Sequence, residues 1–316
     1  MKNMNNKVAT GRTMRLMAAA VVLGMGAQAH TGPALADTLD LADTLDLTDP
    51  AQALTATRKL YCSLEDGKPI TYQWQGRAYS RVPGERDRHL FNVLGMNVRA
   101  CSTVADADRG DGFRLVSREI MLYLDPETND VLRRWSNPWT GADVEVLHVA
   151  NDPVNFRAPL FPVGRDGQPY RFPGRTGGGK VFINVEVPLF YTNPLAGDFQ
   201  GAAGNHYHAM EMFNFIMDEA DLIDGDKDTT GAVVSWARVA QWLPWMQMGS
   251  RPGVMVFNTT GRKLDSWDGL EQVLKDEIAA NYPDYRRPPP ADDARPNETS
   301  WTYYRKIVEQ RRAAGN

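Results

Sequence analysis

A long succession of short apolar segments, separated by turn residues, constrains this chain more than any other feature. The segments run from residue 70 to residue 258, and no stretch of about 10–15 residues between them has a helical period. This pattern disfavours a parallel α/β sheet, whose crossover connections need helices. It predicts a mainly β fold with about nine to eleven strands, arranged as an antiparallel meander β-barrel of the calycin or lipocalin type, closed or nearly closed.

The most patterned part of this succession spans Arg118 to Asn155. Two apolar runs flank a proline-containing turn at residues 126–130, and a third run follows a polar and aromatic loop. An Asn-Asp-Pro corner at residues 151–153 stops the third run. We expect this stretch to form the framework and rim of the barrel.

The two ends of the chain are expected to lie outside the strands. Residues 1–36 have a basic start, an apolar run and a small-x-small site ending at Ala36, which is typical of a secretory signal peptide. Residues 37–50 form an acidic flexible leader. Residues 51–316 form a single β-barrel domain with a short helix at residues 51–64 and helices after Ser266. The chain is therefore expected to be exported to a bacterial periplasm or secreted, although a retained N-terminal anchor is an alternative.

Charge and motifs exclude several classes of partner. The formal net charge is −4, and the signal contributes only basic residues, so the mature chain is more acidic still. An acidic surface repels nucleic acid. No later apolar run reaches the ~18 residues of a membrane-spanning helix. The run Gly177–Lys180 lacks the spacing of a phosphate loop, and no cofactor is expected.

The chain has two cysteines, Cys62 and Cys101. In an oxidising compartment they can form a disulfide that contributes about 3–4 kcal/mol by the chain-entropy model. Two free buried thiols are the alternative.

Three charged residues on predicted strands are the candidate catalytic residues. Glu211 shares the inward face of its strand with aromatic residues, so it needs a cation or acquires a raised pKa. Arg238 shares a face with two tryptophans and is its predicted partner. Glu119 alternates onto an apolar face and is a second inward carboxylate that can divide acid and base roles with Glu211. A purely structural ion pair remains open.

Aromatic and methionine side chains are expected to form the apolar walls of an interior binding site. The predicted ligand-binding residues are Tyr123, Trp135, Trp139, Trp236, Trp242, Trp245 and Met246.

A third possibility is a metal site. His206 and His208 alternate on a strand and can share a metal, but the same alternation sends Glu211 to the opposite face. No third ligand is therefore predicted.

Four pieces of sequence resemble one bacterial family, domain of unknown function 1838. They are YLDPETNDVLRRWSNPWTG, HVANDPVN, WLPWMQMGSRPG and NETSWTYYRK. The resemblance covers nearly all of the chain after residue 36, and it implies no particular activity.

Three functions follow from these observations. The first is an exported barrel that binds an apolar or aromatic small molecule and acts on it by acid/base chemistry. The second is a carrier of a hydrophobic ligand without chemistry. The third is a metal-dependent enzyme that uses His206 and His208.

Overall fold

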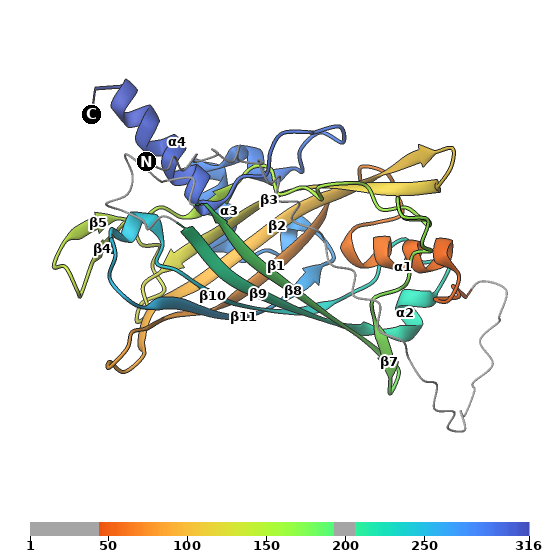
Figure 1. Cartoon of the computed structure of the whole chain (residues 1–316), viewed down its shortest axis with the longest axis horizontal. Coiled ribbons are helices and arrows are strands. Elements are labelled where there is room, and N and C mark those ends of the chain that lie inside the picture. The colour runs from red at the N-terminus through yellow and green to blue at the C-terminus, as the bar shows by residue number, and fades with distance from the viewer. Residues whose placement is uncertain (1–43, 193–205, 316) are drawn as a thin grey trace, which may run out of the picture. The chain divides into compact units, whose positions relative to one another are not determined.

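A nine-stranded antiparallel sheet dominates the computed structural model, which describes residues 44–192 and 206–315 (Figure 1). Its strand order is β6-β3-β2-β1-β11-β10-β9-β8-β7, so neighbours in sequence are mostly neighbours in space. The nine strands are β1 (Ile70–Arg81), β2 (Arg88–Asp106), β3 (Gly110–Leu124), β6 (Val149–Asn151), β7 (Arg175–Gly177), β8 (Lys180–Thr192), β9 (His206–Asp218), β10 (Val233–Ala240) and β11 (Val254–Leu264).

The sheet curves strongly, so that β3 and β9 face each other across a cavity, but it does not close. Strands β1 and β11 pair along their length, as the first and last strands of an up-and-down barrel do. Among the described residues, the two edge strands β6 and β7 are not paired with each other, so the predicted closed barrel is not found. Five prolines lie between residues 152 and 174, where a closing strand would run, and each lacks the N–H that a ladder needs.

Strand β2 runs unbroken through Gly95, although glycine usually weakens the interior of a strand. The predicted strands on either side of the polar and aromatic loop shorten to β4 (Arg134–Ser136) and β5 (Asp143–Glu145), which pair only with each other. They add a small ribbon to one end of the molecule (Figure 1).

Two packed groups fill the ends of the concave side of the sheet. At one end lies helix α1 (Pro50–Tyr61), which Asp49 caps, and its Leu60 packs with Tyr72 and Phe215. A disulfide between Cys62 and Cys101 joins the end of α1 to β2. At the other end lies a group that we call the aromatic cluster, made of Phe91, Tyr123, Trp135, Trp242, Trp245 and Met246.

Helices from the C-terminal region cover the outer face and the open edge. Helix α3 (Gln272–Asn281) packs Leu274 and Ile278 on outward-facing residues of β2 and β3. It begins later than predicted, because residues 267–269 form a separate 3₁₀ turn after Ser266. The remaining helical elements are α2 (Glu219–Ile223), α4 (Ser300–Ala313), η2 (Pro244–Met246), η3 (Trp267–Gly269) and η4 (Pro283–Arg286).

The start of α4 lies beside the open edge of the sheet. Glu298, just before the helix, donates its backbone N–H to the carbonyl oxygen of Pro153, which follows β6. Trp301 packs edge-on against Tyr207 of β9, with ring centroids 4.9 Å apart. The first turn of α4 therefore connects the two halves of the sheet where hydrogen bonds do not.

No helix in the described ranges is both long enough and apolar enough to cross a membrane.

Candidate functional site

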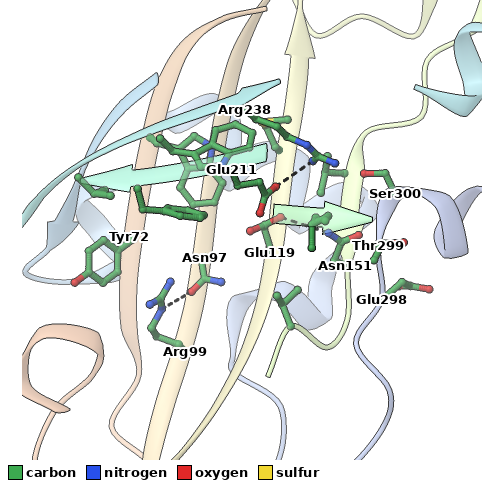
Figure 2. A pocket seen from close by; sticks show the side chains of 18 of the residues that line it. Tyr72, Asn97, Arg99, Glu119, Asn151, Glu211, Arg238, Glu298, Thr299 and Ser300 are labelled. Atoms are coloured by element: carbon green, nitrogen blue, oxygen red, sulfur yellow. Dashed lines mark hydrogen bonds and ion pairs between the residues drawn. The ribbon is translucent and has the colours of Figure 1, made fainter. Parts of the chain in front are cut away.

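A cavity of about 250 Å³ lies within the concave side of the sheet, between α1 and the aromatic cluster (Figure 2). Its walls are mainly apolar and aromatic, with a few charged groups, which is the usual composition of a small-molecule site. The aromatic lining residues are Tyr72, Trp74, Tyr207, Phe213, Phe215 and Trp236.

Glu211 and Arg238 meet in this cavity as the alternation of β9 and β10 predicts. They are directly opposite each other on the two antiparallel strands, and Nη1 of Arg238 lies 3.4 Å from Oε1 of Glu211. The same guanidinium donates a hydrogen bond from Nη2 to the hydroxyl of Tyr207. Arg238 thus holds a carboxylate and a phenol at one position of the wall.

Glu119 enters the cavity from β3, on the opposite half of the sheet. Figure 2 shows its carboxyl group and that of Glu211 pointing toward each other. Burial and the nearby charge of Glu211 raise the pKa of Glu119 to about 7. Nδ2 of Asn151, on the adjacent strand β6, donates to its Oε1 at 3.4 Å. The site therefore holds one carboxylate beside a cation and one carboxyl group that changes protonation state near neutral pH.

Two glycines leave room for Trp74, Gly95 beside its indole ring and Gly261 beside its backbone and Cβ atom. Gly95 and Gly261 stand directly opposite Trp74 on the strands to either side. A Cβ atom at Gly95 would lie 2.4 Å from the indole ring, and one at Gly261 would lie 2.7 Å from the Trp74 Cβ. The two positions accept no side chain, so the tryptophan lies flat and forms part of the cavity wall.

The structure brings together four of the predicted site residues and separates the others. Glu119, Glu211, Arg238 and Trp236 line the cavity. Trp245 instead packs within the aromatic cluster, with centroids 5.5 Å from Tyr123 and 5.8 Å from Phe91. The predicted ligand-binding residues that the cavity wall does not include are Tyr123, Trp135, Trp139, Trp242, Trp245 and Met246. They pack together at one end of the interior of the sheet, next to η2, and support the cavity from that end.

His206 and His208 lie on the outer face of β9, where both are exposed. Both rings contact Phe190, with centroid distances of 5.7 Å and 6.0 Å. The predicted separation of these histidines from Glu211 is thus present in the structure. Over the described part of the chain, no three histidine, cysteine or acidic side chains are close enough to hold a metal ion.

Two polar residues of the cavity, Asn97 and Arg99, escaped the sequence reasoning. They belong to β2, whose other face packs under α3, so the strand is apolar on both sides and its alternation is obscured. Asn97 stands directly opposite Glu119. Two polar residues at alternate positions within residues 93–101, which are otherwise apolar, are the signal that could have revealed them.

Comparison with known families identifies the chain. The model of the family described as "Protein of unknown function (DUF1838)" matches residues 67–308. The chain belongs to this family. The resemblance seen in its sequence motifs is confirmed. The matched residues include every strand of the sheet, from β1 to β11.

Two further comparisons add little. None of the curated proteins compared with the chain matches it. Among solved structures, the chain is similar to Ail, the attachment invasion locus protein of Yersinia pestis, with 4% identity and a TM-score of 0.17. The similarity covers 63% of this chain and 99% of Ail, and at this TM-score it carries no argument.

Proposed function

We propose that this DUF1838 protein binds an apolar or aromatic small molecule in the cavity and acts on it by acid/base chemistry. In this proposal the curved sheet serves as a calycin-like barrel, and the reaction is of the isomerase, cyclase or hydrolase type. The observation that carries the proposal is a carboxyl group with a pKa of about 7, Glu119, facing the ion pair of Glu211 and Arg238.

The roles follow from the two different environments of the carboxyl groups. Glu119 is about half protonated at neutral pH, so it can both donate and accept a proton. Glu211 forms an ion pair with the Arg238 guanidinium. A substrate between them meets a proton donor on one side and this ion pair on the other, and two carboxyl groups with separated roles are a recurrent acid/base arrangement.

The alternative is a carrier that uses the same cavity without chemistry. The cavity is at or below the lower end of the ~300–1,000 Å³ range of small-molecule pockets, and its walls are largely aromatic, which suits tight binding of a small ring system. Binding and turnover must therefore be measured separately.

The test uses Glu119→Gln and Glu211→Gln, with Glu186→Gln as a control because Glu186 is exposed on the outer face of β8. Binding of small aromatic esters, lactones and unsaturated ketones is measured by quenching of tryptophan fluorescence, and products are analysed by mass spectrometry. We expect turnover to fall about 100-fold or more in the two site variants, with dissociation constants nearly unchanged. Binding without turnover in the unmodified protein and in all variants would support the carrier instead.

We also propose that the protein is exported. The signal-like sequence of residues 1–36 supports this, and the Cys62–Cys101 disulfide suits an oxidising compartment. Fractionation of expressing cells, followed by N-terminal sequencing, is expected to give a periplasmic or secreted chain that begins near Asp37. Recovery of the full-length chain in the cytoplasm would refute export.

A further inference from the structure

The cavity holds a second arginine, Arg99, whose surroundings differ from those of Arg238. Its Nε donates to Oδ1 of Asn97 at 2.5 Å, and its Cζ lies 4.7 Å from the centroid of the Tyr72 ring (Figure 2). These contacts hold the guanidinium in place against the wall that α1 and β1 form. Its position is therefore set by neighbouring side chains.

No carboxylate neutralises Arg99 among the residues that the structure describes. Every ion pair formed within those residues involves other groups, and Arg238 alone of the two cavity arginines has an acidic partner. The Nη1 and Nη2 groups of Arg99 also make no hydrogen bond to the described residues, so one N–H of the five on the guanidinium is used. Burial accordingly lowers the pKa of Arg99 below its usual value.

A half-buried cation without an ion-pair partner is costly for a folded protein, because a partly desolvated charge needs compensation. Stacking on an aromatic ring recovers only part of that cost. Glu119 lines the same cavity and attracts Arg99 electrostatically, but the two form no ion pair, and the raised pKa of Glu119 reduces its negative charge near neutral pH. Among the described residues, no carboxylate therefore forms an ion pair with the Arg99 guanidinium.

We infer that the ligand itself supplies it: the cavity takes an amphipathic organic anion, with a carboxylate bound by Arg99 and an apolar or aromatic body. The planar guanidinium fork matches a carboxylate in a two-point hydrogen bond, and both Nη groups are available for it. From Arg99 the body of the ligand lies along Trp74 and Phe213 toward the two glutamates. This inference rests on the proposed function, because it names the substrate class of the same cavity.

Two matched probes test the inference: 2-naphthoate, which carries a carboxylate, and 2-naphthamide, which has the same shape and no charge. Their dissociation constants are measured by calorimetry at pH 6, where Glu119 is mostly protonated, for the unmodified protein, Arg99→Met, Arg99→Lys and Arg262→Met. Arg262 is exposed on β11, so its substitution controls for loss of one positive charge elsewhere. We expect the unmodified protein and Arg262→Met to bind naphthoate at least about tenfold more tightly than naphthamide.

In Arg99→Met this preference is expected to disappear while naphthamide still binds, which also shows that the variant is folded. Arg99→Lys keeps the charge without the fork and is expected to retain part of the preference. Equal affinity for the two probes in the unmodified protein, or a preference that survives in Arg99→Met, would overturn the inference and leave the proposed function standing. If neither probe binds, the inference that the cavity takes an aromatic carboxylate fails, whereas the proposed function is decided separately by the esters, lactones and ketones.

Discussion

Glu211 and Arg238 form a directly opposed cross-strand pair, with Nη1 of Arg238 3.4 Å from Oε1 of Glu211, on the inner face of a curved sheet. The side chains are 20% and 15% exposed, so the pair meets the cavity and little bulk water. Arg238 also donates a hydrogen bond to the hydroxyl of Tyr207, so one guanidinium holds both the Glu211 and the Tyr207 side chains on this side of the cavity.

Removal of Arg238 is expected to destabilise the protein more than removal of the whole pair. Arg238→Met leaves the Glu211 carboxylate beside Glu119 without its cation, which we expect to cost about 3 kcal/mol. The double variant Glu211→Gln/Arg238→Met removes both charges and is expected to recover part of that loss. Urea denaturation measures both, and a double variant that is no more stable than Arg238→Met would contradict the prediction.

The stability of the protein is expected to depend on pH through Glu119. Its pKa is about 7 in the folded protein and near 4.5 when unperturbed, so the folded state retains a proton that the unfolded state releases between these values. The contribution is fully present below about pH 4.5 and is lost as the pH rises through about 7. Relative to the unmodified protein, Glu119→Gln should therefore gain about 3 kcal/mol between pH 4.5 and pH 8. Denaturation curves at several pH values check this, with Glu186→Gln as control; parallel pH dependences of Glu119→Gln and the unmodified protein would contradict it.

Substitution of Gly95 is expected to disturb the cavity wall. The added methyl group of Gly95→Ala would lie 2.4 Å from the Trp74 indole, so the ring must move, at a cost of about 1–3 kcal/mol. The displaced ring should also weaken ligand binding. Thermal denaturation and tryptophan fluorescence measure the two effects. The control is Gly67→Ala, where the positive backbone φ disfavours alanine but no atom lies near the added Cβ. An equal loss of ligand binding in Gly67→Ala would argue against an effect of Gly95→Ala on the cavity wall.

The first turn of α4 is expected to be held to the sheet chiefly by Trp301. This side chain is buried and packs on Tyr207 at the open edge, so Trp301→Ala should cost about 3 kcal/mol of docking free energy. Hydrogen exchange should then increase in α4 more than in β2 or β3. Gln310→Ala, at an exposed position of the same helix, is the control. Unchanged protection of α4 in Trp301→Ala would show that other contacts hold it.

The sequence by itself determined which residues face inward on β3, β9 and β10. Side chains alternate strictly along a strand, so the period of two placed Glu211 and Arg238 on one face and His206 and His208 on the other. The same alternation placed Glu119 on the same face of its strand as Met121. The family motifs could also be recognised without a structure. These properties depend on neighbours in sequence, which is why they could be predicted.

Only the tertiary structure decided what lies across the cavity and how far the sheet closes. Glu119 and Glu211 are 92 positions apart, and their meeting depends on the curvature of the whole sheet. Most of the residues predicted to line the cavity pack against one another instead, because η2 directs Trp245 and Met246 into the interior. Arg99 escaped prediction because β2 is covered on both faces. Within the described residues, β6 and β7 are not paired, and contacts from the start of α4 bridge that open edge. Contacts between distant segments have no periodic signature in the chain, so no local pattern could reveal them.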